Sequence, residues 1–190
     1  MTWLALGLAL FLSIHLTRAL APRWREARIA QLGDKGWKGL YTAISLLGFG
    51  LILWGFSQAR QQPVALWAPI RGMNHLAAML TLVAFVLMAA AYVPRNHLKA
   101  RLQHPMTLAV KTWALAHLLA NNTLADLMLF GSFLVWSILV FRAARRRPVA
   151  AQPAPTAAGT AATVLIGAAA WALFAFWLHA AWLGIAPLGH

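Results

Sequence analysis

Apolar residues gather in six long runs along the chain, and polar and charged residues lie between them. The runs extend over about 3–21, 40–57, 73–93, 106–120, 124–141 and 161–185. About 20 apolar residues in a helix are needed to cross the roughly 30 Å hydrocarbon core of a bilayer. The pattern predicts an all-α, polytopic membrane helix bundle with about six transmembrane helices. The fourth run is the shortest and contains Lys111, which must reach the membrane surface or face the bundle interior.

The composition supports a membrane protein over a soluble one. Hydrophobic residues make up 62% of the chain and charged residues 10%. Soluble domains are usually near half apolar and about a quarter charged. The lipid bilayer is therefore the expected surrounding of this chain.

The distribution of basic residues predicts the orientation. The chain has 16 Lys and Arg against three Asp and Glu, a net charge of +13. Fourteen of the 16 lie in or beside the first, third and fifth connections between runs, and only Arg60 and Arg71 lie in the second. By the positive-inside rule the odd connections are cytoplasmic, so both termini are on the non-cytoplasmic side. Because the basic residues separate apolar runs, we expect lipid headgroups rather than nucleic acid as their partners.

Local signals divide the chain further. No Lys or Arg precedes the first run, so we expect a retained helix rather than a cleaved signal peptide. Residues 1–147 should form a membrane domain of five helices, 148–160 a connector rich in Pro, Ala and Thr, and 161–190 the sixth transmembrane helix. Gly33–Gly36 is typical of a turn. Thr123 and Asp126 have the spacing of a helix N-cap, which favours a capping role for Asp126 over a catalytic one.

Few residues are suited to catalysis or metal binding. The chain has no cysteine, which excludes disulfides and thiolate chemistry, and its three acids offer no carboxylate pair for hydrolysis. Histidines are the best candidates, and four lie within the apolar runs: His15, His75, His117 and His179. Tryptophans at depth could line an apolar slot, namely Trp113, Trp136, Trp171 and Trp177.

The spacing places some candidates on common helix faces. Arg18 lies one turn after His15 on the same face, and Trp113, His117 and Asn121 form one stripe at intervals of four. His104 is 13 residues from His117 and falls on nearly the opposite face. Two histidines from different helices can hold a haem iron. From spacing alone, hydrogen bonding to backbone or lipid headgroups explains each histidine better than metal binding does.

Several motifs together resemble the NnrU family of integral membrane proteins. They are HPM at 104–106, KTWALAHLLAN at 111–121 and LMLFGSF at 127–133, with shorter matches at 14–18, 39–41, 67–69 and 74–76. The resemblance covers about residues 4–141. Asn121-Asn122 stands where the family often has Asn-Gly, a conservative change for a turn.

The resemblance implies a multi-pass protein of the bacterial inner (plasma) membrane, associated with nitrite and nitric oxide metabolism in denitrification. A related plant and cyanobacterial branch, 15-cis-zeta-carotene isomerase, uses b-type haem held by two histidines. Carried over, His15 and His117 would ligate the haem iron, and Arg18 or Lys111 would pair with the propionates. Supporting positions would be His75, His104, Trp113 and Asn121.

Three functions remain open at this stage. The first is a haem b protein that works with respiratory nitrogen-oxide reductase components. The second is a haem-dependent cis–trans isomerase whose small apolar substrate is a carotenoid-like polyene. The third is a haem-free membrane assembly or scaffold protein.

Overall fold

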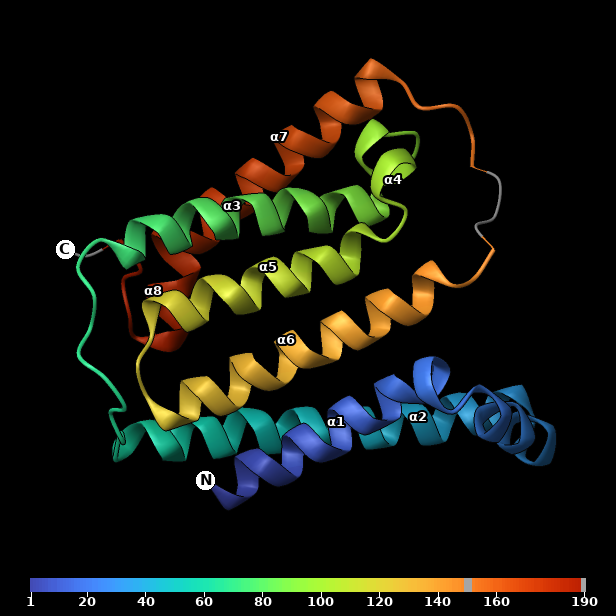
Figure 1. Ribbon diagram of the computed structural model, residues 1–190, viewed down its shortest axis with the longest axis horizontal. Coiled ribbons are helices and arrows are strands. Elements are labelled where there is room, and N and C mark those ends of the chain that lie inside the picture. Colours follow the sequence, from blue (N-terminus) through green and yellow to red (C-terminus); the bar gives the residue numbers. More distant parts are fainter. Residues whose placement is uncertain (149–151, 189–190) are drawn as a thin grey trace. The chain divides into compact units, whose positions relative to one another are not determined.

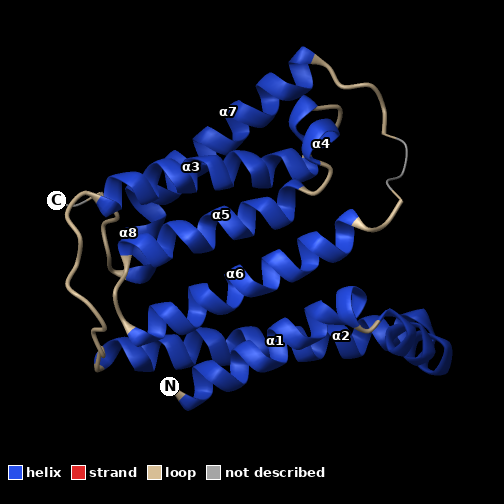
Figure 2. Ribbon diagram, viewed as in Figure 1, coloured by secondary structure: helices blue, strands red, loops and turns tan. Residues whose placement is uncertain are grey.

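The computed structural model describes residues 1–148 and 152–188 of the chain, and all regular secondary structure in them is helical (Figure 2). The elements are α1 (Thr2–Leu20), α2 (Pro22–Gln61), α3 (Met73–Tyr92), α4 (His97–Leu102), α5 (Pro105–Ala120), α6 (Leu124–Arg145), α7 (Ala157–Leu173), the π-helical segment η1 (Phe174–Leu178) and α8 (His179–Leu183). The predicted all-α class is confirmed.

Five helical segments are long and apolar enough to cross a membrane. They are α1, α2, α3, α6 and the continuous run Ala157–Leu183. The other predicted span is α5, which has 16 residues. At 1.5 Å per residue α5 measures about 24 Å, which is short of a full hydrocarbon core. The total of six spans and the position of the termini therefore stay predictions.

The first basic connection is helical, which the sequence pattern did not predict. Helix α2 starts at Pro22 and runs for 40 residues, broken only at Gly33 with φ 69° and ψ 167°. Proline suits a helix start because its missing N–H would have no intrahelical partner there. The predicted turn is thus a kink in a helix, at a backbone conformation that only glycine adopts easily.

Basic and aromatic side chains surround this kink. The guanidinium of Arg25 lies 5.8 Å from the ring centre of Trp37, and that of Arg28 lies 5.7 Å from the ring centre of Trp24. The two tryptophan rings meet edge to face at 6.0 Å. Cation–π contacts of this kind stabilise a guanidinium group without an ion pair.

The chain forms two compact units. Unit 1 comprises Met1–Ala68 and Asn122–Ala143, and unit 2 comprises Pro69–Asn121 and Ala144–His190. Figure 1 shows α1 beside α2 in unit 1, and α3 between α5 and α7 in unit 2.

In unit 1 the backbones of α1 and α2 approach closely at glycines. A Cβ built on Gly7 would lie 2.6 Å from the backbone nitrogen of Ile52, and one on Gly48 would lie 2.8 Å from that of Phe11. A Cβ on Gly55 would overlap the backbone of Leu4. Small residues allow such contact between membrane helices, where tight packing replaces the hydrophobic driving force.

The start of α6 is also fixed within unit 1. The hydroxyl of Thr123 and the carboxylate of Asp126 lie 2.5 Å apart, and the Asp126 N–H lies 3.2 Å from the Thr123 hydroxyl oxygen. This reciprocal arrangement is the predicted N-cap. Leu66 donates to Asn122 O at 2.8 Å and Leu124 donates to Val64 O at 2.9 Å, so a short antiparallel bridge holds the start of α6 against the segment after α2.

In unit 2, α7 starts at Ala157, four residues before the predicted start. A Cβ on Gly167 would lie 2.6 Å from Val86 Cα, so α7 packs closely against α3. The Trp171 Nε1–H donates to Thr81 Oγ1 across the same contact at 3.1 Å. The predicted connector 148–160 includes residues 149–151, which lie outside the described residues, and its last four residues form the first turn of α7.

Candidate functional site

His15 lies in an aromatic cluster of unit 1. Its ring stacks on Phe11 with centres 4.2 Å apart, and it meets Tyr41 at 5.1 Å and Trp136 at 6.4 Å. Its Nδ1 lies 2.6 Å from the carbonyl oxygen of Phe11. A carbonyl only accepts, so Nδ1 is the protonated nitrogen and Nε2 holds the lone pair. The side chain is half-buried.

An apolar groove of about 460 Å³ lies beside this cluster, between α1 and α6. Leu12 and Leu16 line it from α1, and the α6 lining includes Gly131, Ser132 and Trp136. Trp136 Nε1 is buried and has no hydrogen-bond partner in the described part of the chain. A buried donor of this kind usually has an acceptor. Trp136 therefore places an unsatisfied N–H beside His15.

His117 shows the same local arrangement on α5 in unit 2. Its Nδ1 lies 2.8 Å from the carbonyl oxygen of Trp113, and the two rings are 5.1 Å apart. The Asn121 side chain donates to His117 O at 2.8 Å. The predicted stripe of Trp113, His117 and Asn121 is thus confirmed. Lys111 is half-buried two residues before Trp113 on the same helix.

The other candidates lie at helix ends. Arg18 is exposed in the last turn of α1. His104 is the N-cap of α5, and its carbonyl accepts from Thr107 Oγ1 at 2.9 Å. His75 is exposed in the first turn of α3, where its N–H donates to Gly72 O at 3.1 Å. The structure groups Trp113, His117 and Asn121, whereas His15 belongs to the other unit, and its pairing with His117 stays a prediction.

Two aromatic neighbours of His15, Phe11 and Tyr41, were not among the site residues predicted from the sequence. Phe11 lies four residues before His15, so its helical spacing could have indicated the contact. Tyr41 comes from α2, and no signal within α1 points to it. No group of three or more metal-ligating side chains occurs in residues 1–148 and 152–188. A haem iron is held mainly by the porphyrin ring and needs only one or two histidines from the protein, so this absence does not argue against haem.

The chain matches the protein family described as NnrU protein over residues 3–187. This match includes the last helical run, which lies beyond the motifs at 104–133. Neither a curated protein nor a solved structure matches the chain. Because the match covers nearly the whole chain, this protein belongs to the NnrU family.

Proposed function

We propose that this protein is a b-type haem protein of the bacterial inner membrane that takes part in nitrite and nitric oxide metabolism. His15 and His117 are the proposed axial ligands. The observation that supports this choice is the hydrogen bond that each Nδ1 makes to the carbonyl four residues earlier. Metal-ligating histidines commonly donate their second ring N–H to such a group, which orients the ring and makes the other nitrogen a better ligand.

The surroundings of His15 fit a large apolar cofactor. The groove between α1 and α6 is lined by leucines, glycine and Trp136, and His15 itself is packed among aromatic rings. The buried Trp136 N–H offers a donor to an acceptor on a bound group. Arg18 and Lys111 would pair with the haem propionates, because charge-assisted hydrogen bonds to carboxylates are strong. When bound, haem supplies a redox centre and an iron that can coordinate nitric oxide.

An optical spectrum of the purified protein tests this proposal. The wild type, His15→Ala and His117→Ala are compared in the oxidised and dithionite-reduced forms. We expect a b-type Soret band in the wild type and its loss in both variants. His179→Ala is the matched control, because His179 Nδ1 also hydrogen-bonds a carbonyl, that of Ile185 at 2.7 Å, but it is not a proposed ligand.

Other results of the optical spectra would contradict the ligand pair or the haem proposal itself. Loss of the band in His179→Ala with retention in His117→Ala would show that the ligand pair is wrong. A wild type that stays colourless with ample haem supply would contradict the haem proposal and favour the haem-free assembly or scaffold function.

A second candidate function is the isomerisation of a polyene, which the apolar groove beside His15 favours. An extended hydrocarbon suits a groove without charged lining residues. Nitric oxide added to the reduced protein should shift the Soret band if the first function holds. Conversion of a cis-polyene by the reduced protein, without a nitric oxide response, would favour the second. Nitrogen-oxide reductase components are the proposed protein partners of the first function.

The proposed topology has six spans and both termini outside the cytoplasm. It is supported by the basic residues at 18–38, 95–111 and 142–147. The absence of native cysteine allows single-cysteine labelling without background. An impermeant maleimide should label Gln62→Cys in intact spheroplasts and Gln31→Cys only after lysis. The reverse pattern would contradict the proposed orientation. Equal labelling of the two cysteines in intact spheroplasts would mean that residues 31 and 62 lie on the same side of the membrane, which contradicts the proposed topology.

A further inference from the structure

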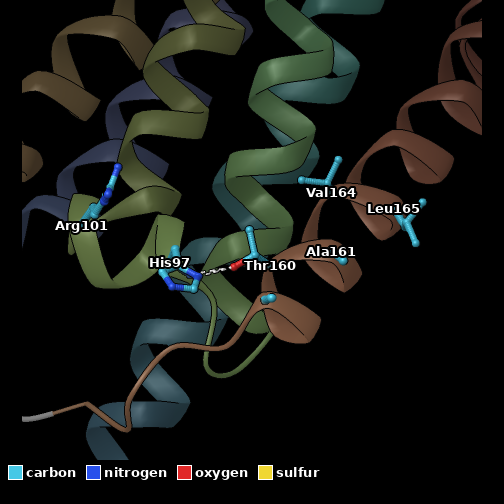
Figure 3. Close-up of a pocket in the computed structure, with 7 residues that line it drawn as sticks. His97, Arg101, Thr160, Ala161, Val164 and Leu165 are labelled. Atoms are coloured by element: carbon cyan, nitrogen blue, oxygen red, sulfur yellow. Dashed lines mark hydrogen bonds between the residues drawn. The ribbon is translucent and has the colours of Figure 1, made fainter.

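A second groove, of about 760 Å³, lies in unit 2 where α4 meets the start of α7. His97 and Arg101 line it from α4, and Val164 and Leu165 line it from α7 (Figure 3). Thr160 joins the two sides. None of these residues belongs to the proposed haem site, so the inference drawn here does not rest on that proposal.

Hydrogen bonds fasten the two walls of the groove to each other. The Thr160 hydroxyl oxygen lies 2.8 Å from His97 Nδ1 and accepts from the His97 backbone N–H at 3.1 Å (Figure 3). The Thr156 N–H donates to Arg95 O at 2.7 Å. A Cβ on Gly159 would lie 2.5 Å from Arg95 O, so the backbones are in contact. The groove is therefore a preformed feature of the fold.

The same contacts define the protonation of His97. The hydroxyl of Thr160 donates its single hydrogen to Thr156 O at 3.0 Å. It can therefore only accept from His97 Nδ1, which must hold a hydrogen. Nε2 is then the ring nitrogen with the lone pair, and it accepts a hydrogen bond from a ligand.

Arg101, at the α4 end of the groove, has a positive charge that no side chain of unit 2 can balance. The chain has three acidic residues, Glu26, Asp34 and Asp126, and all three belong to unit 1. Unit 2 thus has no Asp or Glu side chain to pair with the exposed Arg101. Two neighbouring cations make bonds to carbonyls instead, because Lys99 Nζ donates to Ala91 O at 2.9 Å and Arg95 Nε donates to Ala154 O at 3.3 Å. No side chain of unit 2 can therefore supply an anion at this groove.

The opposite wall is apolar and continues along α7. Val164 and Leu165 are 44% and 70% exposed, and Ala161 lies one turn before them. Both large side chains belong to the run Ala157–Leu183, which is long and apolar enough to cross the membrane. A ligand that fills the groove should therefore have an anionic group at the α4 end and a hydrocarbon chain along α7.

We infer that this groove binds one anionic phospholipid. Its phosphate lies at Arg101, and the N-terminus of α7 adds its partial positive charge to this end of the groove. One acyl chain follows Ala161, Val164 and Leu165. The lipid supplies the negative charge that the side chains of unit 2 lack and covers the exposed apolar side chains at the start of α7.

Lipid add-back to the delipidated full chain tests the inference. Native mass spectrometry measures the binding of phosphatidylglycerol and of phosphatidylcholine with the same acyl chains. We expect the wild type to prefer phosphatidylglycerol, and Arg101→Gln to weaken that lipid about five-fold, the effect of one surface cation on an anionic membrane lipid. Arg71→Gln is the matched control, because Arg71 is an exposed arginine of the same unit that does not line the groove.

Two more measurements separate a lipid from a soluble anion. Leu165→Asn should weaken phosphatidylglycerol while leaving the binding of inorganic phosphate unchanged. Inorganic phosphate that binds as tightly as the lipid would overturn the lipid assignment. Equal binding of the two lipids by the wild type, or equal effects of Arg101→Gln and Arg71→Gln, would overturn the site itself. Thermal unfolding of each variant in detergent establishes that the fold is retained.

Discussion

The two units hold their helices together in different ways. In unit 1, α1 and α2 pack through backbone contact at Gly7, Gly48 and Gly55. In unit 2, much of the specific bonding is at the helix ends, where Asn96, Lys99 and Thr156 bond main-chain groups of neighbouring segments. Unit 2 also has close glycine contacts, at Gly159 and Gly167, so the difference is that unit 2 adds polar side-chain bonds at its helix ends.

The same contrast extends to the two histidines that we propose as ligands. His15 is packed among Phe11, Tyr41 and Trp136, whereas His117 belongs to a stripe that ends in Asn121. Both rings nevertheless make the same hydrogen bond to a carbonyl one turn earlier. A common orientation of Nε2 is thus obtained in two different surroundings, which is the reason to test the two residues as a pair.

The largest effect is expected from Gly55→Ala in unit 1. The added methyl group would overlap the backbone of Leu4, which cannot rotate away, so α1 and α2 must separate. Overpacking of this kind typically costs about 1–3 kcal/mol, and because the contact is with backbone we expect a cost of about 3 kcal/mol. Thermal unfolding in one detergent, followed by tryptophan fluorescence, measures the effect.

Gly50→Ala is the matched control on the same helix. A Cβ on Gly50 meets nothing within 4 Å, and alanine favours a helix over glycine by about 0.5–1 kcal/mol. We expect this variant to unfold at the wild-type temperature or above it. If Gly55→Ala behaves in the same way as Gly50→Ala, then close backbone packing does not hold unit 1 together.

Local and periodic features of this fold could be predicted from sequence. Length and hydropathy indicate the spans, because a helix that faces lipid must be apolar over its whole length. The N-cap formed by Thr123 and Asp126 and the stripe from Trp113 to Asn121 depend only on residues three or four apart, and both are present. The family motifs likewise pointed to the family that the chain belongs to.

Features that join distant residues could not be predicted in this way. The helix at 22–32 is polar and continues into a span, so hydropathy assigned it to a connection. The sequence around a helical glycine does not indicate which residue it contacts. The contact of Gly55 with Leu4 is therefore known only from the structure. The contact of His97 with Thr160 spans 63 residues, and it places the start of α7 within a segment that composition alone assigned to a connector.

A smaller loss of stability is expected from Asn96→Ala in unit 2. This variant tests the polar side-chain bonds at the helix ends. Asn96 is 2% exposed, and its side chain donates to Ala90 O at 3.0 Å and Val93 O at 2.6 Å. It also accepts from the Lys99 N–H at 2.6 Å as the N-cap of α4. Loss of a cap and of buried carbonyl partners should cost about 2 kcal/mol in the free energy of unfolding.

Asn74→Ala, at an exposed position in the first turn of α3, is the control for Asn96→Ala. Hydrogen exchange then locates the effect along the chain. Faster exchange in Asn96→Ala should be confined to α4 and the adjoining ends of α3 and α7, because these are the segments that Asn96 and its neighbours join. Equal acceleration in α1 and α2 would mean that the whole chain unfolds as one cooperative body, and the polar bonds at the helix ends of unit 2 would then not stabilise that unit separately.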